Sequence, residues 1–314
     1  MKVLLIGLGS MGSNHFRVLK LLLKNSKDLL LYDSNKKRLS LFLKKHNVMQ
    51  ERNLDKLIKM ADRVIIASNT SSHYKIVIKC IKNGAKIIFV EKPFMKSFDE
   101  AKKVNKILKN NKIKIFVGLI ERFNSSIVSL RNYLKTKKIY HFEANRTARV
   151  PFRNKDINVV NDLMIHDLDL AIQFNGKIKS INSIGITQNR MIEYAKVNII
   201  HTNKAISTLT ASRITDKKIR VLNFLAKDFF IEANLLENEL NVYKKARYSH
   251  TKDKRYSVSN FLEKIQANPT EPLLAELNEF LFFKEKEFKK LENFGYEYNL
   301  ELLKYCHLIQ KQIL

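Results

Sequence analysis

A histidine and several aspartates lie close together in the second half of the sequence, within Asp162-Leu163-Met164-Ile165-His166-Asp167-Leu168-Asp169. The segment has a helical pattern, and the spacing i, i+4, i+7 would bring Asp162, His166 and Asp169 to one face of an α-helix. Histidine can accept a proton near neutral pH, and a carboxylate one turn away can orient it and stabilise its charged form. We therefore take His166 as a candidate general base and Asp162 as its partner.

The same residue types fit three other roles. They could form a solvent-exposed ion pair or an Asp/His metal site, or the histidine could belong to the core. The sequence has no second histidine at metal-ligand spacing, so we expect no metal site.

A lysine with a fixed position is the second candidate. Lys92 lies in Glu91-Lys92-Pro93, directly after a buried apolar run at 86–90, and the proline restricts the backbone beside it. Such a lysine can present its ammonium group to a substrate hydroxyl or to a nicotinamide. The alternative is that Lys92 is one more surface lysine in a lysine-rich chain.

A glycine motif occupies the start of the chain, where Gly7-Leu8-Gly9-Ser10-Met11-Gly12 follows an apolar run and precedes a helical pattern. In this context Gly7 permits the tight turn, Gly9 lets the backbone approach a pyrophosphate, and Gly12 lets the helix pack on the strand. The amides of the helix N-terminus, at Ser10 and Met11, are suited to bind the anion. The motif predicts a dinucleotide site.

An aspartate twenty-one residues beyond Gly12 indicates which dinucleotide binds. Asp33 ends the next apolar run, where a carboxylate accepts hydrogen bonds from ribose hydroxyls and repels a 2′-phosphate, which favours NAD. The basic group Lys36, Lys37 and Arg38 follows it and could neutralise that phosphate, so NADP stays open. Asp33 could instead be a helix N-cap or turn aspartate.

Residues 1–119 alternate short apolar runs with longer amphipathic ones, as expected of parallel strands joined by helices. We expect strands at 3–6, 29–32, 64–67, 86–90 and 113–117, with helices near 11–25, 35–46, 71–83 and 97–111. This is a doubly wound α/β domain of the Rossmann type. Ligands in such sheets bind past the carboxyl ends of the strands, which places Ser68, Asn69, His73, Glu91 and Lys92 at the nucleotide site.

The pattern changes after Gly118. We expect helices near 122–136 and 160–174, a strand near 138–148, and further strands at 180–187, 194–201, 204–213, 217–226, 229–234 and 239–243. Consecutive strands without intervening helices predict a large open, mostly antiparallel sheet. The chain ends with helical segments around 272–290 and 298–313. We therefore divide it into residues 1–119, a cofactor-binding domain, and residues 120–314, an α/β domain whose last helices can pack back on the first.

Composition narrows the class of protein. The chain has 45% hydrophobic residues and no long apolar span, so we expect a globular protein of the cytoplasm without membrane segments. Its net charge of +28 comes from 58 basic and 30 acidic residues, but the lysines are scattered, which argues against nucleic-acid binding. The two cysteines, Cys80 and Cys306, have no metal-ligand spacing and form no disulfide framework.

Taken together, these motifs resemble the Gfo/Idh/MocA family of sugar and polyol oxidoreductases over the whole chain. The resemblance rests on the glycine turn, on Ala67 to His73, on Glu91-Lys92-Pro93, on Gly118 followed by Arg122-Phe123-Asn124, on Asp162 and His166 followed by Asp169, and on the closing Glu271-Pro272-Leu273. It implies a Rossmann domain followed by an α/β domain whose exposed sheet face commonly builds dimers or tetramers. One departure is Asn69, where the family often has proline.

The resemblance also implies residue roles. The family's catalytic lysine, aspartate and histidine fall on Lys92, Asp162 and His166, so His166 would take the alcohol proton while Lys92 positions the hydroxyl. Within the family, the segments around Arg149, Arg153 and Asp162 look most like members that oxidise the 3-hydroxyl of a UDP-N-acetylhexosamine. We therefore expect substrate contacts from Arg122, Asn124, Arg149, Arg153, Asp162 and His166.

Three arginines in this part of the chain are of a residue type that binds the diphosphate of a nucleotide sugar. Arg146, Arg149 and Arg153 could grip a diphosphate through bidentate hydrogen bonds, although surface charge in a basic protein explains them equally well. Two alternatives stay open: a dehydrogenase of free sugars or inositol, and a non-catalytic NAD-binding sensor.

Overall fold

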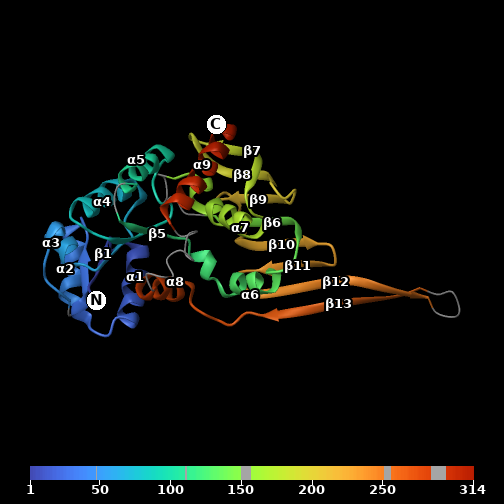
Figure 1. Cartoon of the computed structure of the whole chain (residues 1–314), viewed down its shortest axis with the longest axis horizontal. Helices are drawn as coiled ribbons and strands as arrows, with labels where there is room; N and C mark the ends of the chain where they lie inside the picture. The colour runs from blue at the N-terminus through green and yellow to red at the C-terminus, as the bar shows by residue number, and fades with distance from the viewer. Residues whose placement is uncertain (47, 110–111, 150–156, 251–255, 284–294) are drawn as a thin grey trace. The chain divides into compact units, whose positions relative to one another are not determined.

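The computed structural model describes residues 1–46, 48–109, 112–149, 157–250, 256–283 and 295–314 (Figure 1). The chain divides into two compact units. Unit 1 comprises residues 1–120 and 272–307, and unit 2 comprises residues 121–271 and 308–314.

Unit 1 is built on a five-stranded parallel sheet with the order β2-β1-β3-β4-β5. The strands are β1 (Val3–Ile6), β2 (Leu29–Tyr32), β3 (Arg63–Ile66), β4 (Ile87–Glu91) and β5 (Lys114–Gly118). The sheet centre is apolar throughout, and all four residues of β1 are buried, as expected for strands covered on both faces. The predicted strands agree with these to within about one residue at each end.

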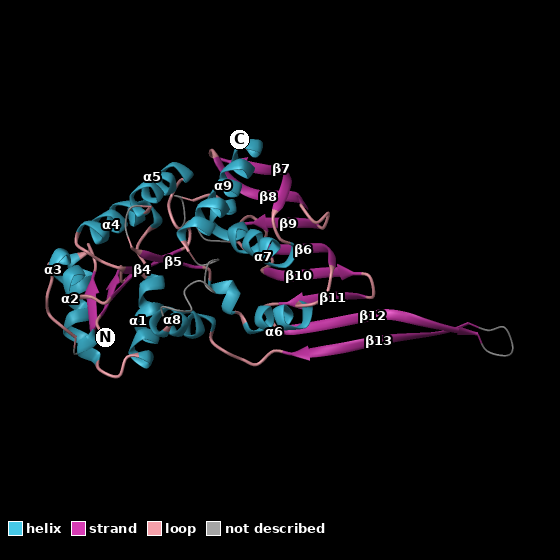
Figure 2. Ribbon diagram, in the orientation of Figure 1, coloured by secondary structure: helices cyan, strands magenta, loops and turns pink. Residues whose placement is uncertain are grey.

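Helices connect the strands of unit 1 (Figure 2). They are α1 (Ser10–Leu22), α2 (Lys36–Lys45), α3 (Leu54–Met60), α4 (Thr70–Lys82) and α5 (Phe98–Leu108). The sequence patterns predicted all of these except α3, which has seven residues, too few for a clear helical period.

A late segment of the chain completes the core of unit 1. Helix α8 (Pro272–Phe282) lies beside α1 (Figure 1) and buries Leu277 and Phe280 in the same apolar cluster as Val3 and Phe116. The ring of Phe280 makes edge contacts with those of Phe89 and Phe116 at centroid distances of 5.3 Å. Burial of such side chains stabilises the packing of α8 by a few kcal/mol each.

Unit 2 contains an eight-stranded sheet with the order β13-β12-β11-β10-β6-β9-β8-β7. Its strands are β6 (Ile139–Thr147), β7 (Ile178–Gln188), β8 (Met191–His201), β9 (Ile206–Ser212), β10 (Ile219–Ala226), β11 (Phe229–Asn234), β12 (Glu239–His250) and β13 (Tyr256–Gln266). Neighbouring strands are antiparallel except β6 and β9, which confirms the mostly antiparallel sheet. The prediction missed β13 and the outer half of β12, which pair with each other beyond the end of β11 (Figure 2).

One face of this sheet is packed against helices. Helix α6 (Ser125–Leu134) contacts β13, and α7 (Ile165–Asn175) contacts β6 and β9. The ring of Phe174 on α7 lies 4.8 Å from that of Phe224, between centroids. The last helix is α9 (Tyr296–Ile313), and near its end Gln312 binds Ser183 of β7. Over the described ranges, none of the helices combines the length and the low charge needed to cross a membrane.

Candidate active site

The glycine turn of unit 1 has the backbone that its sequence predicts. Gly7 has φ +97°, and its N–H donates to the Tyr32 carbonyl at 2.8 Å. A Cβ on Gly7 would lie 2.7 Å from the Ser68 nitrogen, and a Cβ on Gly12 would lie 1.9 Å from the Gly7 oxygen. Both positions therefore require glycine, because the turn, the helix and the neighbouring loop approach each other too closely for a side chain.

The start of α1 is open to a ligand. A Cβ on Gly9 would meet nothing within 4 Å, and Gly9 caps α1 without a side-chain hydrogen bond. The first turn of α1 carries no acidic residue, Ser10 is exposed and Met11 is half-buried. Unsatisfied amides at a helix N-terminus bind anions, so this turn fits the pyrophosphate of a dinucleotide.

Asp33 holds the turn from the end of β2. Its Oδ2 accepts the N–H of Leu8 at 2.8 Å, and its Oδ1 accepts the N–H of Asn35 at 2.7 Å. Arg38 donates to the same Oδ2 at 3.2 Å from an exposed position. Asp33 is thus both a turn aspartate and a clamp on the glycine motif, while Asn35 is the N-cap of α2. Oδ2 already accepts two hydrogen bonds, whereas Oδ1 accepts one and has a further lone pair with which to accept a ribose hydroxyl.

His73 has a different place from the one predicted. It is fully buried, with Nε2 3.0 Å from the Ser68 carbonyl oxygen and Nδ1 3.1 Å from that of Pro93. Burial lowers the pKa of His73, and the two carbonyl groups oppose this. His73 therefore joins the two loops and has no surface for a cofactor. Ser68 stays part-exposed and Asn69 exposed, with the Ser68 hydroxyl 2.8 Å from that of Ser72.

Glu91 and Lys92 follow β4. The Glu91 side chain is buried, with Oε1 2.6 Å from Nε2 of His15 and Oε2 accepting the Lys92 N–H at 3.2 Å. Lys92 itself is part-exposed. The sequence interpretation missed His15, whose only signal is its position three residues after Gly12 on α1.

Asp162 and His166 lie in a helical segment of unit 2 that changes pitch between them. Residues Val160–Met164 form a π-helical turn, in which the Ile165 N–H donates to the Val160 carbonyl, and α7 follows. The prediction of a single α-helix from Asp162 to Asp169 is therefore corrected, because the wider turn moves Asp162 out of the i, i+4 relation. Such π-turns often occur at functional sites.

Both candidate residues are inside unit 2, with Asp162 7% exposed and His166 6% exposed. This excludes the solvent-exposed ion pair. Oδ2 of Asp162 lies 3.8 Å from Nη1 of Arg213, which is held by the Glu193 carboxylate and by the Ile157 carbonyl at 2.6 Å. Arg213 was not among the predicted residues. Its position after β9 gives no signal in the sequence, because only the sheet pairing brings it to Asp162.

Two predicted substrate arginines have structural partners. Arg122 is 3% exposed and makes a two-point ion pair with Asp169, with Nε to Oδ2 at 2.7 Å. Arg146 is 2% exposed and binds Asp167 through Nε and Nη2 and Glu121 through Nη1. Burial lowers the pKa of Arg146, but the carboxylates of Asp167 and Glu121 raise it by more than burial lowers it. The pKa of Arg146 is therefore above its ordinary value. The expected contact of Arg146 with a diphosphate is therefore corrected, because its guanidinium is buried and binds Asp167 and Glu121. The guanidinium of Arg122 makes its bidentate contact with the Asp169 carboxylate.

The remaining predicted substrate residues differ in exposure. Asn124 is the N-cap of α6 and accepts the Ser126 N–H at 3.0 Å, which gives its side chain a structural role. Arg149 is exposed and pairs with the exposed Asp216. Arg153 lies outside the described residues. Within the described part of the chain, no group of three or more His, Cys, Asp or Glu side chains has the arrangement of a metal site.

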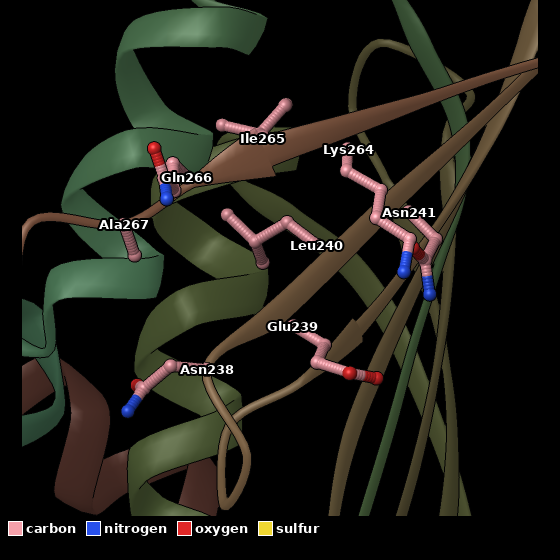
Figure 3. Close-up of a pocket in the computed structure, with 8 residues that line it drawn as sticks. All are labelled: Asn238, Glu239, Leu240, Asn241, Lys264, Ile265, Gln266 and Ala267. Atoms are coloured by element: carbon pink, nitrogen blue, oxygen red, sulfur yellow. The ribbon is translucent and has the colours of Figure 1, made fainter.

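A pocket of unit 2 lies elsewhere. It lies where β12 begins and β13 ends (Figure 3). Its volume is about 310 Å³. Its lining is Asn238, Glu239, Leu240, Asn241, Lys264, Ile265, Gln266 and Ala267. None of these was a candidate, and the lining has no histidine or cysteine.

The sequence resembles known dehydrogenases. UDP-N-acetylglucosamine 3-dehydrogenase of Acidithiobacillus ferrooxidans is 27% identical over 194 residues, which cover 60% of this chain and 61% of the relative. The scyllo-inositol 2-dehydrogenase (NAD(+)) of Bacillus subtilis is 31% identical over 147 residues, covering 44% and 43%. The chain thus matches less than two thirds of the length of either relative.

Solved structures show the same fold over nearly the whole chain. UDP-N-acetylglucosamine 3-dehydrogenase GnnA from Acidithiobacillus ferrooxidans superposes with a TM-score of 0.84 at 21% identity, covering 100% of this chain and 97% of the other. An oxidoreductase from Agrobacterium radiobacter, in complex with NAD+, L-tartaric acid and magnesium, gives 0.79 at 18% identity, covering 99% and 96%. These likenesses confirm the predicted two-part α/β fold.

A family model agrees with the glycine turn and the parallel sheet. Residues 1–119 match the Gfo/Idh/MocA model, described as an oxidoreductase family with an NAD-binding Rossmann fold. The chain therefore carries, over residues 1–119, an NAD-binding Rossmann domain of the Gfo/Idh/MocA oxidoreductase family.

Proposed function

We propose that this protein is an NAD-dependent dehydrogenase that oxidises a sugar hydroxyl, namely the 3-hydroxyl of UDP-N-acetylglucosamine or a related UDP-sugar. The observation that carries the proposal is the buried pair Asp162 and His166, in a chain with an NAD-binding domain. The carboxylate lies within the π-turn and the imidazole in the helix that follows it. A module that only binds NAD needs no base, whereas oxidation of an alcohol does.

The proposal gives each residue a role. Bound NAD supplies the hydride acceptor. His166 takes the hydroxyl proton as the carbon loses hydride and its C–O bond becomes a carbonyl. Asp162 helps to orient substrate and base, and Lys92 positions the hydroxyl. Within the proposed cofactor domain, residues 1–119, the amides at Ser10 and Met11 face the pyrophosphate and Asp33 accepts the ribose hydroxyls.

Residues 120–314 are proposed to bind the substrate. Two observations support a UDP-sugar as that substrate. The first is that the relative of 27% identity is named for UDP-N-acetylglucosamine. The second is the exposed guanidinium of Arg149, which a diphosphate can bind in place of the Asp216 carboxylate. The 31% relative is named for scyllo-inositol, which keeps a dehydrogenase of free polyols as the second candidate.

The proposal is tested by following NADH or NADPH formation with NAD+ and NADP+ against UDP-N-acetylglucosamine, glucose and myo-inositol. Glutamate and a sugar aminotransferase are added to remove a 3-keto product. We expect turnover of UDP-N-acetylglucosamine with NAD+ and no turnover with NADP+. Turnover of a free polyol alone would retain the fold and His166 but overturn the UDP-sugar substrate, and no turnover with any of them would favour an NAD-binding sensor.

The role of His166 is tested separately. His166→Ala should lower kcat by about 10²–10⁴-fold while the affinity for NAD stays nearly unchanged. His307→Ala is the matched control, because His307 is half-buried, stacks on the Phe98 ring at a centroid distance of 5.9 Å, and has no proposed role in catalysis or assembly. Full activity in His166→Ala would remove His166 from its proposed role.

We also propose that a second copy of the chain covers the open face of the unit 2 sheet. The strand registers align a row across six strands in which all residues except His141 are apolar or aromatic: Ile200, Ile206, His141, Leu225, Phe230 and Tyr243. Four of these are 44–48% exposed, namely Ile200, Ile206, Leu225 and Tyr243. A contiguous apolar band of this kind is typical of a protein interface.

A polar row runs beside the apolar one: Asn198, Thr208, Glu143, Asn223, Glu232 and Asn241. A polar row beside an apolar one is typical of the rim of a protein interface. Light scattering should show a dimer or tetramer that Leu225→Lys dissociates. A wild-type monomer would contradict this arrangement.

A further inference from the structure

His15 links two parts of unit 1 that the proposed reaction uses. It lies on α1, five residues after the helix begins at Ser10, and it is fully buried. Its Nε2 is 2.6 Å from Oε1 of Glu91, the residue before Lys92. Because an ionised carboxylate only accepts hydrogen bonds, Nε2 carries the proton and donates.

The bond between His15 and Glu91 is a costly way to stabilise a helix. Among the described residues, the Nδ1 atom of His15 is buried without a hydrogen-bond partner. A buried polar atom in that state costs stability, whereas an apolar side chain on the same face of α1 would pack without this penalty. Among the described residues, this ring makes its hydrogen bond to Glu91, which points to a role other than stability.

The Glu91 carboxylate binds the backbone of Lys92 as well as His15. Its second oxygen, Oε2, accepts the Lys92 N–H at 3.2 Å. Gly118 of the neighbouring strand leaves space for this carboxylate, since a Cβ at that position would lie 3.2 Å from the same Oε2. The ring of Phe89 packs edge-on against His15 at a centroid distance of 5.6 Å and fixes the imidazole from the strand side.

We propose that His15 is a positioning residue that couples occupancy of the glycine turn to the position of Lys92, through Glu91. The route is continuous: the turn begins α1, α1 carries His15, His15 holds Glu91, and Glu91 holds the Lys92 amide. A ligand that fixes the N-terminus of α1 thereby fixes the backbone that carries the lysine. This inference rests on the proposed function for the task of Lys92, but the coupling itself exists without a sugar substrate.

The test uses the full chain and ADP, a probe that can occupy the glycine turn but lacks the nicotinamide. Amide hydrogen exchange of the segment 87–95 is measured with and without ADP in the wild type, in His15→Leu and in His15→Gln. Gln keeps an N–H donor for Glu91, and Leu does not. Val18→Ala is the matched control, because Val18 is fully buried on α1 and belongs to the apolar cluster of unit 1.

ADP should slow exchange of the segment in the wild type, by about fivefold or more if the coupling has the usual size. His15→Leu should lose most of this slowing while still binding ADP, His15→Gln should keep most of it, and Val18→Ala should behave as the wild type. Equal slowing in His15→Leu and wild type would show that the ligand acts on the segment directly and would overturn the proposal. Equal loss in Val18→Ala would show a general loosening of α1 and would overturn it too.

Kinetics provide the second readout. If the wild type oxidises a sugar, His15→Leu should lower kcat with little change in the KM for NAD+, and His15→Gln should restore kcat. An unchanged kcat in His15→Leu would contradict positioning of Lys92 by His15. If no sugar is oxidised, the proposed function fails, whereas the exchange experiment still decides whether His15 couples the two sites.

Discussion

Nη2 of Arg146 lies 2.7 Å from Oδ1 of Asp167, and each side chain is at most 2% exposed. Asp167 follows His166 directly, so this ion pair fastens the helix that carries the proposed base to strand β6. Asp169, two residues further on, is fastened in the same way by Arg122. The cations next to the base therefore hold the helix in place.

Removal of Arg146 should destabilise the protein strongly. Arg146→Ala leaves the Asp167 carboxylate buried without its cation, which typically costs about 3–5 kcal/mol of the free energy of unfolding. Arg149→Ala is the control, because its ion pair with Asp216 is exposed and such pairs contribute little. Urea denaturation of both variants checks this. Similar stability of the two would show that the buried pair is not important for folding.

Arg149 should matter for substrate affinity instead. Arg149→Ala should raise the KM for a UDP-sugar and leave the KM for a free hexose or polyol unchanged, because only the nucleotide sugar carries a diphosphate. Steady-state kinetics with both substrate types measure this. An equal effect on both substrates would exclude Arg149 as a diphosphate contact.

The glycines of the turn should separate cofactor binding from folding. A Cβ at position 12 collides with the Gly7 oxygen, so Gly12→Ala should lower the melting temperature and weaken NAD binding together. A Cβ at position 9 meets only open space, so Gly9→Ala should keep the melting temperature but weaken NAD binding, since the methyl group enters the pyrophosphate site. Thermal unfolding and titration with NADH decide between these outcomes. Normal NADH affinity in Gly9→Ala would place the pyrophosphate elsewhere.

Much of this architecture was open to prediction because it depends on local patterns. The glycine turn, the buried strands and the position of Asp33 follow from residue type and spacing in a single stretch of chain. The tasks of Arg122 and Arg146 do not, since a basic residue near a proposed site fits a substrate as well as a buried aspartate. Arg146 faces Asp167 because α7 packs on β6, and Arg122 faces Asp169 from the 3₁₀ turn Ile120–Phe123. Both contacts join segments that are distant in the sequence.

Two other features needed the three-dimensional structure. His15 and Glu91 are 76 residues apart, and their contact depends on how α1 packs beside β4. The π-turn at Val160–Met164 has ordinary helical residues, so the spacing of Asp162 and His166 was read with the wrong pitch. Contacts between distant segments and local changes of helical pitch leave no periodic signal in the sequence.

His201 should make stability depend on pH. Burial lowers its pKa below the ordinary value of 6.5, against the opposing effect of the Gly176 and Lys177 backbone. The unfolded chain then binds a proton at a higher pH than the folded one, so the free energy of unfolding falls as pH drops below about 6.5.

His201→Gln removes this titration and keeps groups that can bind the Gly176 carbonyl and the Ser207 hydroxyl, both 2.8 Å from the imidazole. Urea denaturation between about pH 7.5 and about pH 5.5 should give a shallower pH dependence for the variant. Other buried histidines such as His73 are common to both proteins and cancel in the difference. The same slope in the two would show that His201 does not titrate differently on folding.

The central claim is transfer of hydride from a nucleotide sugar to NAD+, and isotope transfer tests it most directly. UDP-N-acetylglucosamine labelled with deuterium at C3 is incubated with the protein and NAD+, and the mass of the NADH is measured. The wild type should form NADH that carries the deuterium, and His166→Ala should form it at a greatly reduced rate. Unlabelled NADH from this sugar, or NADH formed only with a free polyol, would contradict it.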